Sequence, residues 1–180
     1  MKKYNIIYAD PPWNYLVRTG IPNGIQTKYP TLSIPQICNL PIRTVADYHS
    51  VLFLWTTDAM IPDALRVISA WGFQYRTVAF VWSKRTVQNV PHHMWGNWTL
   101  KNTEQCLLAT RGQPHSLFKR NSTVRQLIEA PKQEHSRKPD QVSERIVELL
   151  GDIPRLELFA RRKTPGWDVW GNEVTNDIEI

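Results

Sequence analysis

Residues 4–15, YNIIYADPPWNY, pass directly from an apolar segment into an acid, two prolines and a tryptophan. The apolar run at residues 4–9 is short, prone to β structure and ended by a Pro-Pro break, which predicts a buried strand. A turn needs no tryptophan, and a hydrophobic core needs no aspartate. The tetrapeptide from Asp10 to Trp13 therefore indicates a functional site at the end of this strand.

The rest of the chain alternates between strand-like and helix-like segments. Apolar runs predict further strands at residues 51–57, 73–82, 103–110, 125–130 and 155–160. Helical spacing or helix-start signals predict helices at residues 33–39, 59–71 and 139–150. This alternation favours an α/β fold in which helices cover the faces of a sheet. Ligands bind such sheets beyond the carboxyl ends of the strands, where Asp10 is expected.

Individual residues mark the ends of the predicted helices. Ser33 is expected to cap the first helix and Asp58 the second. Gly72 and Gly151 each follow a predicted helix and supply its stop. Residues 14–30 and 83–101 have no apolar period, so both are expected to be loops beside the site that contact a substrate, the first as a lid.

Length and composition are those of one soluble globular domain, residues 1–180. The chain is 42% hydrophobic and 21% charged. No apolar run approaches the roughly eighteen residues that a membrane span needs. The first residues are too polar and too few for a secretory signal. These features predict a cytoplasmic protein without a membrane partner.

The charge and the content of tryptophan and cysteine limit the kinds of ligand that the protein is expected to bind. The net charge is +6 and the pI about 9.5, which favours a polyanion such as nucleic acid. Eight tryptophans among cations also suit stacking on bases. Cys38 and Cys106 stand far apart, and His92 and His93 have no cysteine or acid at ligand spacing, so no metal site is expected.

The residues Asp10 to Trp13 suit the transfer of a group to the exocyclic amine of a nucleobase. Such an amine is a poor nucleophile, because its lone pair is delocalised into the ring. Acceptors on its N–H groups localise electron density on nitrogen, and Asp10 and the Pro11 carbonyl can provide them. Pro11 and Pro12 fix the backbone and remove N–H donors, while Trp13 offers a face for stacking. The plain structural alternative is an Asp-Pro turn with Trp13 in the core.

Five blocks of sequence carry a resemblance to a known family. ADPPW resembles the catalytic signature of amino methyltransferases that use S-adenosylmethionine. Four later blocks are similar, in order, to segments of the MT-A70 family: FLWTT with WGF, NTEQCLLATRG, EHSRKPDQV, and LELFARR with GWDVWGNE. That family includes mRNA N6-adenosine methyltransferases and many bacterial and phage DNA adenine methyltransferases. The resemblance implies a Rossmann-like methyltransferase fold, with a mostly parallel sheet and helices on both faces.

The order of these blocks implies a permuted methyltransferase. The catalytic strand comes first and the strand at the cofactor end comes last. The wider group of amino methyltransferases carries a Phe-x-Gly-x-Gly loop after that late strand, whereas this chain has ELFARRKTPGW there. Members of the MT-A70 family commonly lack the loop, so the difference refines the match.

The resemblance assigns roles by position. Asp10, Pro11, Pro12 and Trp13 would form the catalytic pocket, with Asp10 also near the methionine end of the cofactor, S-adenosylmethionine. Lys138 would contact the carboxylate of the cofactor, and its ribose and adenine would be surrounded by Arg161, Asn172 and Glu173. Without the resemblance, the plain interpretation is that Lys138 and Arg161 are charged surface residues. Asn172 and Glu173 would then form an ordinary turn.

The resemblance also implies a substrate. We expect methyl transfer to the N6 amine of adenine in nucleic acid, with Trp13, Tyr15, Trp95 and Arg111 contacting it. DNA is preferred because the chain has no evident RNA-binding module. The alternatives are RNA, cytosine N4 in DNA, and a catalytically silent family member that only binds nucleic acid. A homodimer is left open.

Overall fold

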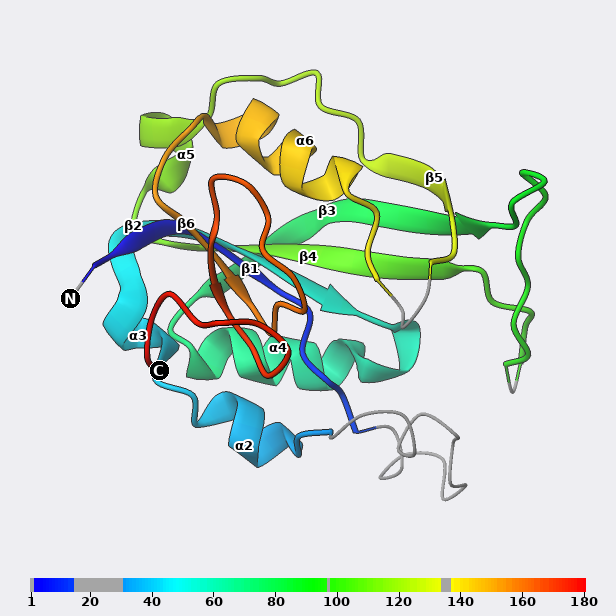
Figure 1. The fold of residues 1–180 in the computed structure, drawn as a ribbon, viewed down its shortest axis with the longest axis horizontal. Helices are drawn as coiled ribbons and strands as arrows, with labels where there is room; N and C mark the ends of the chain where they lie inside the picture. The colour runs from blue at the N-terminus through cyan, green and yellow to red at the C-terminus, as the bar shows by residue number, and fades with distance from the viewer. Residues whose placement is uncertain (1, 15–30, 97, 134–136) are drawn as a thin grey trace.

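The computed structural model describes residues 2–14, 31–96, 98–133 and 137–180. Its centre is a seven-stranded sheet in the order β5-β3-β4-β2-β1-β6-β7 (Figure 1). The strands are β1 (Tyr4–Ala9), β2 (Ala46–Thr56), β3 (Gln74–Arg85), β4 (Thr103–Arg111), β5 (Leu127–Pro131), β6 (Arg155–Leu158) and β7 (Asp168–Trp170). Strand β4 is antiparallel to β2 and β3, and every other neighbouring pair is parallel. The prediction of a mostly parallel α/β sheet is confirmed.

Helices cover both faces of the sheet, as predicted. They are α2 (Ile34–Cys38), α3 (Ile42–Val45), α4 (Ile61–Ala70), α5 (Pro114–Phe118) and α6 (Gln141–Leu150), with a 3-10 turn η1 (Asp58–Met60) leading into α4. Buried side chains of α2, α3 and α4 share one hydrophobic cluster on one face, and α6 contributes to a second cluster on the other. Figure 1 shows α6 above the sheet and α2 and α4 below it.

Strand β1 is buried on both faces, which explains its unbroken apolar sequence. Successive side chains of a strand point to opposite faces. Ile7 and Ala9 accordingly join the cluster that contains α4, while Ile6 and Tyr8 join the cluster that contains α6. The strand therefore lies at the centre of the fold and carries Asp10 out of it at a fixed position.

Three of the four predicted helix signals are confirmed and one is wrong; Gly151, at φ +89, ends α6 as predicted. Ser33 caps α2 in a capping box with Gln36. Gly72, at φ +81, ends α4, and the N–H of Phe73 donates to the Ile68 carbonyl at 3.0 Å. Asp58 does not cap α4, because it lies inside η1, where no side-chain cap is formed.

Several boundaries differ from those predicted, because pairing extends the strands. Strand β2 begins at Ala46 rather than residue 51, and β3 continues to Arg85, which pairs with Pro131 of β5. Strand β6 ends at Leu158, and α6 begins at Gln141. The sequence analysis missed α3, α5 and β7, which are too short to show a period.

The strand directions bring one set of chain ends to one edge of the sheet. The carboxyl ends of β1, β2, β3 and β6 lie there, and so does the beginning of β4, because β4 runs the opposite way. Residues that follow β1 and residues that open β4 therefore become neighbours. Within the described ranges, the helices include none long and apolar enough to cross a membrane.

Candidate active site

Asp10 lies directly after β1 at this edge of the sheet. Its side chain is 34% exposed, and its Oδ2 accepts a hydrogen bond from Lys138 Nζ at 2.6 Å. Removal from water raises the pKa of Asp10 above its ordinary value, because low polarity penalises the charged form, and Lys138 opposes this effect. Lys138 is thus the main group that favours the ionised carboxylate.

Lys138 belongs to a chain of four alternating charges that runs into the protein. Its Nζ lies 3.2 Å from Glu104 Oε2, and the other oxygen of Glu104 accepts from Lys84 Nζ at 2.5 Å. The side chains of Lys138 and Glu104 are each 9% exposed, and that of Lys84 is 3% exposed. We call Asp10, Lys138, Glu104 and Lys84 the four-charge chain; its formal charge is zero.

The two inner acid–base partners of the four-charge chain stabilise each other's charged forms. Burial alone would lower the pKa of Lys138, but Asp10 and Glu104 raise it above its ordinary value. Burial alone would raise the pKa of Glu104, but Lys138 and Lys84 lower it. Each of these groups is therefore charged at neutral pH.

A pocket of about 620 Å³ opens beside Asp10 and Lys138. Its lining mixes carboxylates with cations. The carboxylates are Asp10, Asp140, Glu157 and Glu173, and the cations are Lys132, Arg137, Lys138, Arg161 and Arg162. The volume is that of a cavity for a small-molecule ligand, and the mixed lining suits a zwitterion better than an apolar compound.

The pocket brings together residues from distant parts of the sequence. Asp10 comes from the first strand, Lys138 from the segment before α6, and Arg161 from the segment after β6. Arg161 Nε lies 3.7 Å from Glu173 Oε1, so the two predicted cofactor residues face each other. Asn172, predicted beside them, is exposed and does not line the pocket.

Glu157 is a pocket residue that the sequence analysis missed. It lies on β6, and Thr164 Oγ1 donates to its Oε2 at 3.1 Å. Burial raises the pKa of Glu157 to about 7, against weaker opposition from Thr164 and Arg162. This carboxyl group changes its charge near neutral pH, inside the pocket.

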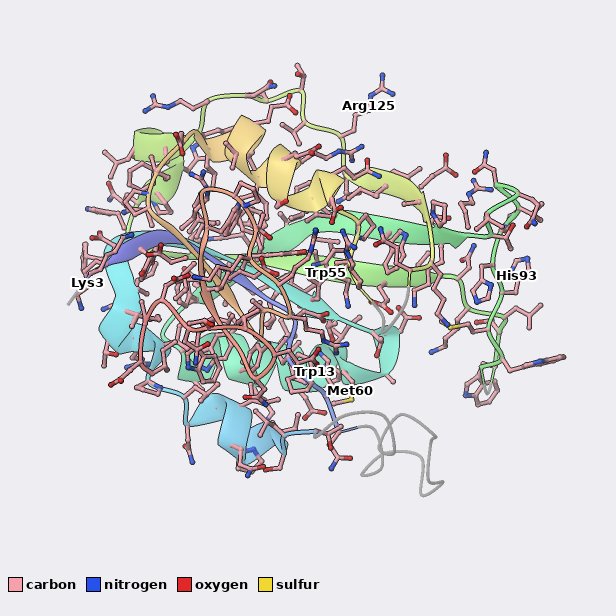
Figure 2. All side chains as sticks on the ribbon, viewed as in Figure 1. Lys3, Trp13, Trp55, Met60, His93 and Arg125 are labelled. Carbon is pink, nitrogen blue, oxygen red and sulfur yellow. The ribbon has the colours of Figure 1, made fainter. Side chains whose placement is uncertain are left out.

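The structure contradicts the expected stacking role of Trp13. Its side chain is 3% exposed, its indole N–H donates to the Trp55 carbonyl at 3.0 Å, and it belongs to the same cluster as Met60. Figure 2 shows Trp13 beside Met60 below the sheet. The ring has no open face for a base, so Trp13 is a core residue that anchors the chain after Asp10.

The carbonyls of Pro11 and Pro12 each accept a backbone hydrogen bond. The Pro11 carbonyl accepts from the Trp13 N–H at 2.8 Å, and the Pro12 carbonyl accepts from the Leu32 N–H at 3.0 Å. A carbonyl has two lone pairs, so Pro11 retains capacity for a second donor. The segment after Asp10 is therefore fixed at both prolines.

The other predicted substrate residues do not lie together at the pocket. Arg111 ends β4 and, because β4 is antiparallel, lies at the opposite end of the sheet from Glu104, roughly 24 Å along the strand. Arg111 therefore lies away from the pocket, and its contact with the nucleic acid stays a prediction. Trp95 is 94% exposed on the arm between β3 and β4 that carries His93 (Figure 2). Tyr15 lies outside the described residues.

The MT-A70 family model matches residues 4–173. The chain belongs to the MT-A70 family. The match covers β1, the pocket and the four-charge chain, and it confirms both the resemblance and the prediction of an adenine N6 methyltransferase. MT-A70 methyltransferases generally use S-adenosylmethionine.

The proteins to which the chain is similar are of two sizes. The chain is 35% identical to the type II methyltransferase M.MunI of a Mycoplasma species, over 99% of this chain and 82% of that protein. It is 27% identical to the N(6)-adenosine-methyltransferase catalytic subunit METTL3 of Homo sapiens, over 96% of this chain and 28% of that protein. A putative MT-A70-like protein of Medicago truncatula is 25% identical, over 27% of its length. The chain thus spans little more than a quarter of these two relatives.

The pocket residues fit the MT-A70 cofactor by their chemistry. S-adenosylmethionine carries a positive sulfonium, an ammonium, a carboxylate, a ribose diol and an adenine. The carboxylates Asp10, Glu157 and Glu173 can face the cations and the diol, and Lys138 or Arg161 can face the carboxylate. Among the described residues, no group of three or more His, Cys, Asp or Glu side chains could hold a metal ion.

Three functional candidates escaped the sequence analysis: Lys84, Glu104 and Glu157. A weak signal was present for the first two, since each is a charged residue inside or at the end of an otherwise apolar strand. Such residues are almost never buried unless they are paired. The partner could not be inferred, because the antiparallel direction of β4 was not known.

Proposed function

We propose that the protein transfers a methyl group from S-adenosylmethionine to the N6 amine of adenine in DNA. The observation that carries this proposal is the position of Asp10. Its carboxylate is fixed at the edge of the sheet, is paired with Lys138 at 2.6 Å, and opens into a pocket of about 620 Å³ with a mixed-charge lining.

Asp10 acts as the acceptor for the amine. An ionised carboxylate has about four lone-pair positions, so its bond to Lys138 leaves capacity for an N–H of the base. The Pro11 carbonyl provides the second acceptor. With both N–H groups held, the nitrogen lone pair is directed away from the ring and the nucleophile is preorganised. Asp10 also stabilises the proton that leaves after transfer.

When bound, S-adenosylmethionine supplies an electrophilic methyl group on a positively charged sulfur. Asp10 and Glu157 line the pocket with carboxyl groups that can face this positive charge. Lys138 holds the carboxylate end, while Arg161 and Glu173 face the ribose and adenine; Asn172 lies outside the pocket lining, and its contact with the adenine stays a prediction. A glutamate accepts from both ribose hydroxyls, and an asparagine pairs with an adenine edge.

The polymer enters from the exposed arm between β3 and β4. Residues 86–102 contain no acidic side chain, and Trp95 and Trp98 of this arm are 94% and 97% exposed. Open tryptophans on an arm without acidic side chains favour stacking on unpaired bases. A duplex adenine must leave its stack to expose the amine. With Trp13 in the core, Trp95 is the better candidate for stacking, and Tyr15 stays a prediction.

DNA is favoured by the relative that matches over most of both chains, the type II methyltransferase of a Mycoplasma species, since type II methyltransferases modify DNA. RNA is the second candidate, because the chain is also similar to the catalytic subunit METTL3. One domain, a homodimer and a cytoplasmic location remain predictions.

The test is a direct one. The protein is incubated with S-adenosylmethionine labelled in its methyl group and with matched DNA duplexes, DNA single strands and RNA, and the products are digested and analysed by mass spectrometry. N6-methyladenine in DNA supports the proposal. N6-methyladenosine found in RNA alone would show that the substrate is RNA and not DNA. Cofactor binding by calorimetry without any methylated product would favour a silent binding protein.

A further inference from the structure

We propose that Glu104 and Lys84 are positioning residues for methyl transfer: they hold Lys138 in place, and Lys138 in turn holds Asp10 as the acceptor of the amine. The inference rests on the proposed function, because it concerns the same site. Neither residue lines the pocket, so both act through Lys138.

The geometry fixes Glu104 from two sides. Its Oε1 accepts from Lys84 and its Oε2 faces Lys138, so each carboxylate oxygen has one ammonium partner. Rotation of the carboxylate would exchange or lose both contacts. Because Glu104 opens β4 and Lys84 lies on the neighbouring strand β3, their backbones are also held by the sheet.

Lys138 is held equally firmly between two acids. Its Nζ lies 2.6 Å from Asp10 and 3.2 Å from Glu104, and it stands 5.4 Å from the ring centroid of Trp55. Lys84 makes the same kind of contact with Trp82, at 5.2 Å. Both ammonium groups therefore have aromatic as well as ionic partners. Removing one ionic partner of a buried ammonium group costs free energy, because the charge is then only partly compensated.

The alternating charges of the four-charge chain control how strongly Lys138 pairs with Asp10. With Lys84 in place, Glu104 is already neutralised on one side and competes only partly with Asp10 for Lys138. Without Lys84, Glu104 would draw Lys138 toward itself. Asp10 would then be harder to ionise and less able to accept from the amine.

Other groups also act on Asp10, and they stay constant in the comparison. The charged and titratable side chains that interact with Asp10 come from β1, β4, β6 and the flanking segments. They are Tyr8, Glu104, Cys106, Lys138, Glu157 and Arg161. Hydrogen bonds and ion pairs connect Lys84 to Asp10 through Glu104 and Lys138.

Two variants separate this role from a structural one. Lys84→Met keeps the length of the side chain and leaves Glu104 with Lys138 alone. The acid limb of the pH profile of kcat should move upward by about one unit, with about tenfold slower turnover below it. The double variant Lys84→Met with Glu104→Gln keeps the buried charge balanced and removes the acid that competes with Asp10 for Lys138. The acid limb should then move downward, while KM for DNA changes little.

Lys2→Met is the matched control. It removes a lysine that pairs with Asp168 at 2.5 Å, is 59% exposed, and lies at the opposite end of β1. Its kcat and acid limb should equal those of the wild type. A purely structural role would lower the melting temperature of the two test variants and leave all the acid limbs in one place, which would overturn the inference.

A second readout does not depend on activity. The carboxyl carbon of Asp10 is followed by carbon-13 NMR as the pH is changed, in the wild type and both variants. A midpoint that rises in Lys84→Met and falls in the double variant supports the inference even if no methyl transfer is seen, in which case only the proposed function fails. A midpoint that does not move overturns the inference.

Discussion

Glu157 makes the stability of the protein depend on pH in an unusual direction. Burial raises the pKa of its carboxyl group from 4.5 to about 7. The folded protein then binds this proton more tightly than the unfolded chain does. Stability from this group is therefore present below about pH 4.5, declines as the pH rises, and is lost above about pH 7.

The magnitude follows from the size of the shift. Each pKa unit corresponds to about 1.4 kcal/mol, so the ionised form of Glu157 lowers the free energy of unfolding by up to about 3 kcal/mol. Glu157→Gln keeps the shape and the hydrogen bond from Thr164 but removes the charge. We expect the variant to be more stable than the wild type by about 2–3 kcal/mol at pH 8, and nearly equal to it at pH 4.5.

Urea unfolding at a series of pH values measures this difference. Glu173→Gln is the control, because it removes a carboxylate of the same pocket whose side chain is 57% exposed, and it should change stability by less than about 1 kcal/mol at every pH. A difference between Glu157→Gln and the wild type that stays constant from pH 4.5 to 8 would refute the reasoning, and so would a variant that is less stable at pH 8.

Three further variants test the site and its support. Asp10→Asn should lower kcat by about 10²- to 10³-fold, since one preorganised acceptor is replaced, while circular dichroism shows an unchanged fold; turnover near the wild-type level would remove Asp10 from catalysis. Lys138→Met should weaken S-adenosylmethionine binding in calorimetry and lower kcat, because it also leaves Asp10 without its cation; an unchanged dissociation constant would confine Lys138 to the four-charge chain. Trp13→Ala should lower the free energy of unfolding by about 3–5 kcal/mol in urea, because the ring is buried; a loss below about 1 kcal/mol would contradict the core position.

The sequence predicted the fold where a local pattern is also a global one. An unbroken apolar run such as β1 can only be buried on both faces, and Gly72 can only end a helix in the conformation that the structure shows. Short elements such as β7 and α3 escaped, because three or four residues carry no period and depend on their neighbours in the sheet. The edge of the sheet at which a terminal strand residue lies was predictable only where the direction of its strand was known.

Strand direction explains the unequal success at the site. Asp10 follows a parallel strand, so the general rule for α/β sheets places it at the ligand edge. The same rule misleads for β4, whose carboxyl end carries Arg111 away from that edge and whose first residues bring Glu104 to it. The family resemblance does not remove this ambiguity, because similarity of a block says which residues recur and not which way the strand runs.

Burial of Trp13 changes what the DPPW tetrapeptide does. An open ring would contribute to binding, whereas this ring lies in the core and donates to the Trp55 carbonyl. Trp55 also lies beneath Lys138, at 5.4 Å from its Nζ. The tryptophan of the tetrapeptide therefore fixes the segment that carries Asp10 against the same residue that packs against the cation of Asp10. Accurate placement of one carboxylate then depends on core packing as well as on charge, and the two contributions separate experimentally, because Trp13→Ala acts on stability and Lys84→Met acts on the pH profile.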